Sequence, residues 1–64
     1  MNVEEAIEVI CNECPDPYAK SYAMVARCLE GNMLRVQILY ILSNLQYWRG
    51  ERAREVKRVL KGVV

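Results

Sequence analysis

The chain contains no histidine, and its 64 residues include no phenylalanine and only three glycines. Histidine is the commonest general base and the commonest metal ligand, so a Ser–His or Cys–His nucleophile pair is excluded within one chain. The glycines stand far apart, and none begins a phosphate-binding loop. The sequence also offers no pair of carboxylates and no activated nucleophile that could catalyse a reaction without histidine. We therefore expect that the protein is not an enzyme and that it binds no cofactor and no small-molecule substrate.

Long hydrophobic runs are missing as well. The longest, Tyr22 to Ala26 and Ile38 to Leu42, are far shorter than the roughly 20 residues of a membrane span. The first residues are acidic, whereas a signal peptide begins with basic ones. Three cysteines, an odd number, argue against a secreted disulfide scaffold. We therefore expect a cytoplasmic protein with reduced thiols that does not contact a membrane.

The length allows one domain, and the 53% hydrophobic fraction is high enough for a folded core. The net charge of +1 hides a strong asymmetry between the two ends. Residues 1–16 carry five acidic and no basic side chains, whereas residues 34–64 carry seven basic side chains against two glutamates. Such a split marks either end of the chain as a candidate partner surface.

Capping residues divide the chain into helical segments. Asn2 and Glu5 have the spacing of a capping box, and apolar residues then recur at helical spacing for about 11 residues. Asp16 and Pro17 suit the N-cap and the first position of a second helix, and Gly31 suits the position just past its end. The apolar side of this second helix is predicted to consist of Tyr18, Tyr22, Val25, Ala26 and Leu29.

The third segment is the longest, with Asn32 as its N-cap and a helix predicted from Met33 to Arg49. One face carries Leu34, Ile38, Ile41, Leu42, Leu45 and Trp48, and a second face carries Val36, Tyr40, Ser43 and Tyr47. A helix that is apolar on two sides lies at the centre of a bundle or at an interface. We expect the central positions of the first face to be buried: Ile38, Ile41, Leu42 and Leu45.

A fourth segment, Glu51 to Lys61, begins with an acidic residue and ends with basic ones, which suits the helix dipole. Its apolar side consists of Ala53, Val56, Val59 and Leu60. No segment alternates as a strand does. The sequence therefore predicts an all-α fold, a single helical domain over residues 1–64. We expect a small bundle of three main helices plus a short C-terminal fourth helix.

The cysteines form one C-x-x-C pair, Cys11 and Cys14, and a third thiol, Cys28. A structural zinc site needs four ligands, so Asp16 or a cysteine of a second subunit would have to complete it. A redox role requires a lowered thiol pKa, yet this pair lies at the end of a predicted helix beside acidic residues. We therefore predict cysteines that pack in the core and hold no metal.

Basic residues gather on the fourth segment. Arg54, Lys57, Arg58 and Lys61 fall within one sector of a helical projection and form a predicted basic ridge. Such a ridge suits the phosphates of a nucleic acid, but it also suits a solvated helix face paired with Glu51 and Glu55. The acidic N-terminal helix, folded against this ridge, would neutralise it.

Tyrosine and tryptophan supply all the aromatic side chains, and these residues are enriched at interfaces. We predict that the second face of the third helix binds a partner through Val36, Tyr40, Ser43 and Tyr47. The main hypothesis is a small helical interaction protein, homodimeric, that binds a protein partner. The alternative is a nucleic-acid-binding accessory protein that uses Arg54, Lys57, Arg58 and Lys61.

The segment from Leu39 to Lys61 carries the pattern L-Y-I-L-S-N-L-x-x-W-R-G-E-x-A. In this pattern the chain resembles small, uncharacterised helical proteins that phages and prophages encode. The resemblance covers about a third of the chain and carries over no ligand and no site residue. It implies a bacterial cytoplasm and an accessory gene as the setting.

Overall fold

The computed structural model describes all residues from Met1 to Val64. The first helix, α1 (Val3–Glu13), begins at the predicted capping box. The Asn2 side chain accepts a hydrogen bond from the Glu5 N–H at 2.8 Å, and the Glu5 carboxylate accepts one from the Asn2 N–H at 2.9 Å. The helix ends at Cys14, which is extended (φ −70°, ψ 131°) because it precedes a proline. The prediction for this helix is confirmed.

The second helix, α2 (Pro17–Ala26), also begins as predicted. The Asp16 carboxylate accepts hydrogen bonds from the N–H groups of Tyr18 and Ala19, at 2.8 and 3.0 Å. Its predicted apolar side is only partly confirmed, since Ala26 is buried and Tyr22 packs against the core. Tyr18 and Val25 are exposed, which the prediction did not expect. The helix buries Ala19, Ala23 and Ala26. These small side chains bring α2 close to its neighbours on both sides, and the larger side chains lie on its flanks.

The third helix, α3 (Gly31–Ser43), is shorter than predicted and begins after Glu30, not after Asn32. Gly31 has φ +63°, a conformation that favours glycine, and the chain turns there between α2 and α3. The helix ends at Ser43 because the side chains of Ser43 and Asn44 both donate to the Tyr40 carbonyl, at 2.8 and 2.9 Å. Such local bonds compete with helix continuation.

The fourth helix, α4 (Glu51–Lys61), agrees with its prediction in both bounds. It is as long as α1, so the chain forms four helices of similar length rather than three main helices and a short one. The class is all-α, as predicted. No helix combines the length and the hydrophobicity that crossing a bilayer requires.

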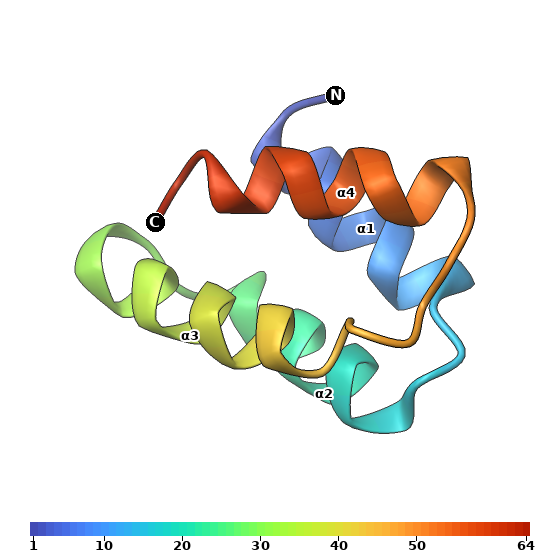
Figure 1. The fold of residues 1–64 in the computed structure, drawn as a ribbon. Coiled ribbons are helices and arrows are strands. Elements are labelled where there is room, and N and C mark those ends of the chain that lie inside the picture. Colours follow the sequence, from blue (N-terminus) through green and yellow to red (C-terminus); the bar gives the residue numbers. More distant parts are fainter.

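The helices form two pairs (Figure 1). α1 lies beside α4, and α2 lies beside α3, with α1 also packed on α2. All four helices and the connection before α4 contribute to one core, which contains these completely buried larger side chains: Ile10, Cys14, Ile38, Ile41, Leu45, Val56 and Leu60. Of the four central positions predicted to be buried, Leu42 is only partly covered. Leu45 is buried although it lies beyond the end of α3.

Candidate interaction surfaces

Hydrophobic side chains project into solvent along the outer side of α3. Met33 is 67% exposed, Val36 43%, Leu39 54% and Tyr40 52%. We refer to these four residues as the α3 outer face. Residues three and four apart lie on the same side of a helix, so the helix is apolar towards the core and also towards solvent.

The predicted partner residues are only partly brought together. Val36, Tyr40 and Ser43 lie on one side of α3 and are exposed. Tyr47 is 81% exposed, but it lies in the connection after α3 rather than on the helix. The prediction omits Met33 and Leu39, although their positions three residues before and after Val36 place them on the same side.

Two side chains of α2 extend the exposed apolar surface, namely Tyr18 at 69% and Val25 at 51% exposure. The two helices are joined at this surface by Tyr22 and Tyr40, whose ring centroids are 5.9 Å apart with planes tilted by 30°. The Gln37 side chain also donates a hydrogen bond to the Tyr22 carbonyl at 3.0 Å. These contacts hold α2 and α3 together as one aromatic surface.

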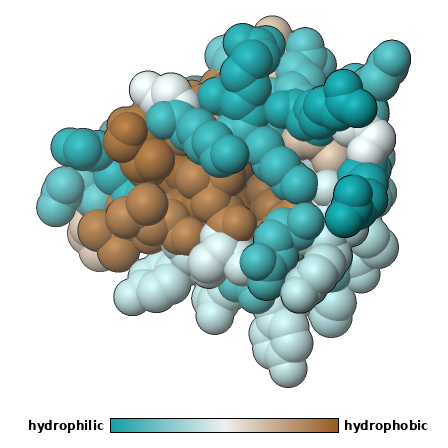
Figure 2. Space-filling model, viewed as in Figure 1, coloured by the Kyte–Doolittle hydropathy of each residue, from teal (hydrophilic) through white to brown (hydrophobic).

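Charge is divided unevenly between the two helix pairs. α2 and α3 carry one charged residue each, Lys20 and Arg35. In contrast, α1 carries four glutamates and α4 carries seven charged residues. Figure 2 shows hydrophilic side chains over α4 and hydrophobic surface below it, towards α3. The α2–α3 pair is therefore an almost uncharged layer with apolar groups on its outside.

The four residues of the predicted basic ridge do not share one environment. Arg54, Arg58 and Lys61 are exposed on α4, as expected. Lys57 is half-buried, and its ammonium donates a hydrogen bond to the Trp48 carbonyl at 2.7 Å. Lys57 therefore belongs to the junction between α4 and the connection that precedes it. Arg58 lies 4.0 Å from the Glu55 carboxylate, an exposed contact that contributes little to stability.

The acidic first helix packs against α4, but Arg54, Arg58 and Lys61 of the ridge stay exposed. Its ion pair to α4 joins Glu13 to Arg52, with a shortest distance of 2.6 Å. The hydrogen-bonded carboxylate raises the pKa of Arg52. Arg54, Arg58 and Lys61 therefore keep their charges free of the first helix.

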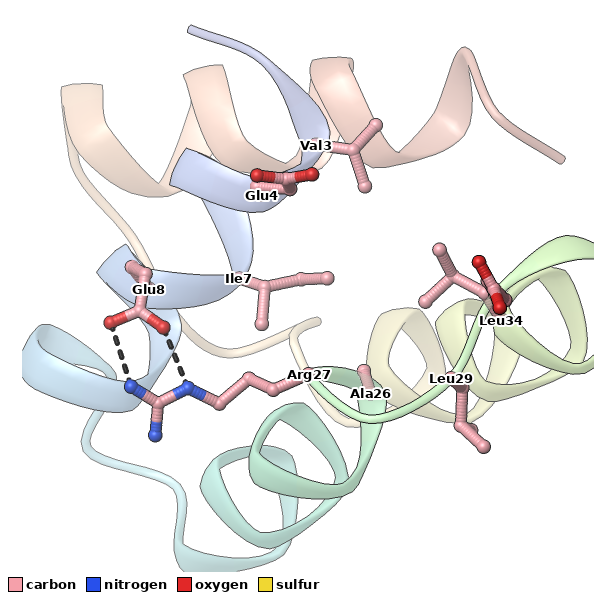
Figure 3. Close-up of a pocket in the computed structure, with 9 residues that line it drawn as sticks. Val3, Glu4, Ile7, Glu8, Ala26, Arg27, Leu29 and Leu34 are labelled. Atoms are coloured by element: carbon pink, nitrogen blue, oxygen red, sulfur yellow. Dashed lines mark hydrogen bonds and ion pairs between the residues drawn. The ribbon is translucent and has the colours of Figure 1, made fainter.

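A cleft of about 510 Å³ lies between the start of α1, the end of α2 and the start of α3 (Figure 3). Apolar side chains, among them Val3, Ile7 and Leu34, line it. At one end the Arg27 guanidinium donates to the Glu8 carboxylate through two hydrogen bonds, of 2.6 and 3.0 Å. This pair connects α2 to α1, and the carboxylate raises the pKa of Arg27.

The three cysteines occupy different environments. Cys14 is buried, Cys11 is half-buried and Cys28 is exposed, so the prediction of core cysteines is wrong for Cys28. Burial is the main cause that raises the pKa of the Cys11 and Cys14 thiols. A raised pKa lowers the thiolate fraction and with it the reactivity of the thiol. No three Cys, Asp or Glu side chains lie close enough together to hold a metal ion.

The geometry thus offers an apolar outer face on α3, a basic region at α4 and a cleft beside α1. The phage or prophage setting stays a prediction. Comparison of the chain with models of protein families, with characterised proteins and with solved structures gives no match.

Proposed function

We propose that this protein acts through association rather than catalysis, as a small helical protein that forms a homodimer through its α2–α3 layer. The observation that carries the proposal is the α3 outer face, which consists of Met33, Val36, Leu39 and Tyr40. Contiguous exposed apolar surface with polar surroundings is typical of an interaction site. Tyrosine at its centre suits such a site because its ring is apolar and its hydroxyl is polar.

Charge favours a second copy as the occupant. In a two-fold dimer the same surface of each subunit meets itself, so a charged face would place like charges together. The α2–α3 layer carries only Lys20 and Arg35 and avoids this repulsion. A highly charged partner would find almost no opposite charge there, whereas an identical uncharged face is complementary to it.

The polar groups at the end of this face are already paired. Ser43 and Asn44 donate to the Tyr40 carbonyl within the same chain. Burying a polar group is costly when its hydrogen bond is lost. Because these bonds are internal, a second copy covers this end of α3 without breaking them.

Sedimentation velocity at rising micromolar concentration tests the dimer. We expect the wild type to approach twice the 7.4 kDa chain mass. The double variant Val36→Lys and Leu39→Lys should stay monomeric with unchanged helicity, since both side chains are exposed. Val64→Lys is the matched control, because Val64 is 42% exposed and lies after α4, outside the α2–α3 layer. A wild type that is monomeric at all concentrations, or a dimer that survives the double substitution, would overturn the proposal.

A further inference from the structure

A second cleft, of about 330 Å³, lies where the connection from α3 meets α4. Its lining includes three cationic side chains and no carboxylate. The six lining residues are Gln46, Trp48, Arg49, Gly50, Arg54 and Lys57. The amide of Gln46 and the indole of Trp48 add neutral hydrogen-bond donors. We refer to this site as the α4 basic cleft.

The cations of this cleft have no acidic partner. The ion pairs of the structure involve Arg27, Arg52 and Arg58. Arg49, Arg54 and Lys57 therefore bring to one cavity three positive charges that form no ion pair. Like charges repel one another, and an anion bound between them relieves this repulsion.

Contacts within the chain hold the cleft in shape. Lys57 uses one of its three N–H donors on the Trp48 carbonyl, at 2.7 Å, which ties α4 to the connection and leaves two donors free. Gly50 is the N-cap of α4, and no side chain caps the helix there. The first N–H groups of α4 and its dipole add positive potential beside the three cations.

The cleft continues into a row of basic residues. Arg54 lines the cleft, and Arg58 and Lys61 follow it at helical spacing on the exposed side of α4. The row thus extends positive charge beyond the space of a single small anion. A linear polyanion matches this arrangement, with one phosphate in the cleft and the following phosphates along α4.

Trp48 is half-buried and packs against the core, and the part of it that lines the cleft narrows the class of polyanion. Proteins that bind single strands combine basic grooves with aromatic rings, on which unpaired bases stack. In a duplex the bases are already stacked and paired. We propose that the α4 basic cleft and the row of Arg58 and Lys61 bind the phosphodiester backbone of single-stranded nucleic acid, with a base against Trp48. This site shares no residue with the α3 outer face, so the inference is independent of the proposed dimer.

Fluorescence anisotropy with labelled oligo(dT), at about 50 mM salt and above, tests the cleft. The variant Arg49→Ala with Arg54→Ala removes two cations of the cleft, both exposed. Lys20→Ala with Arg35→Ala removes two cations of the α2–α3 layer and changes the net charge equally. We expect the first pair to weaken binding at least tenfold, and the second to leave it within twofold of the wild type.

The salt dependence gives a second readout. Each phosphate contact on a single strand contributes about 0.7 to the slope of log affinity against log salt, so the cleft variant should lower that slope by about 1.4. Equal losses in both double variants would mean that only overall charge matters, and would overturn the inference. Absence of oligo(dT) binding by the wild type at about 50 mM salt would overturn it too.

Trp48 is the only tryptophan, so its emission reports directly on the site. Oligo(dT) should quench this emission in proportion to binding, while inorganic phosphate at the same phosphate concentration should not. Binding without any quenching, or equal affinity for a DNA duplex of the same length, would overturn the assignment to single strands.

Discussion

Replacing Leu45 by alanine is the sharpest test of how this small core is built. Leu45 is completely buried, although it belongs to the connection after α3. Leucine-to-alanine changes at buried positions cost about 2–5 kcal/mol, because apolar contact is lost and a cavity remains. At about 0.05–0.15 kcal/mol per residue, a 64-residue domain has a total unfolding free energy of roughly 3–10 kcal/mol. The single change therefore removes a large fraction of the stability.

Thermal unfolding followed by circular dichroism measures this effect. A loss of 1 kcal/mol lowers the melting temperature of a domain of this size by about 4–8 °C, so Leu45→Ala should lower it by roughly 10–40 °C. Leu42→Ala should cost about half as much, because Leu42 is only partly covered. Met24→Ala, at an exposed position, should change it little. A melting temperature of Leu45→Ala within a few degrees of the wild type would refute this account of the core.

Three further predictions concern the helix ends and the thiols. Asp16→Ala removes an acceptor of two N–H groups and should lower the unfolding free energy by about 1 kcal/mol in urea titration; an unchanged midpoint would contradict the role of this cap. Gly50→Ala should cost about 1–3 kcal/mol because of the backbone at φ +115° and ψ 174°, although an added Cβ meets no atom within 4 Å. The control Gly62→Ala, at φ −72°, should be neutral or slightly stabilising, and equal losses at both glycines would disprove this reasoning. In the folded protein iodoacetamide should modify Cys28 first and Cys14 only after unfolding, and mass spectrometry showing early modification of Cys14 would contradict its burial.

Predictions from the sequence succeed where a local interaction decides the structure. The capping box at Asn2 and the Asp16–Pro17 pair fix where α1 and α2 begin, and both effects act within a few residues. The bounds of α4 follow similarly from the acidic residue at its start and the basic residues at its end. These features do not depend on what else the chain packs against.

Predictions fail where packing between helices decides. The alanines of α2 are buried and its tyrosine and valine are exposed, because α2 lies close to both α1 and α3. A prediction from hydrophobic side-chain size alone would bury the tyrosine and the valine before the alanines. The predicted end of α3 is wrong for another reason. The side chains of Ser43 and Asn44 donate hydrogen bonds to the Tyr40 carbonyl and end the helix, although the helical spacing of apolar residues continues beyond it.

The candidate sites can also be divided into those that local spacing predicts and those that depend on packing. Sequence periodicity identifies Val36 and Tyr40 on the outer side of α3, because residues at helical spacing share a side. It also identifies Arg54, Arg58 and Lys61 on α4 for the same reason. The α4 basic cleft is different, since it depends on how the connection folds against α4. No spacing rule links Arg49 or Trp48 to Lys57.

The pairing of α1 with α4 has a consequence for how the chain folds during synthesis. Glu13 and Arg52 are 39 residues apart, so the side of α1 that faces α4 stays uncovered until the last helix has been made. At about 5–20 residues per second, a ribosome needs roughly 2–8 s to synthesise this stretch. During those seconds the nascent α1–α3 segment therefore exposes the side of α1 that α4 later covers. We therefore expect that folding is completed only when α4 docks, and that the incomplete chain is prone to aggregation before then.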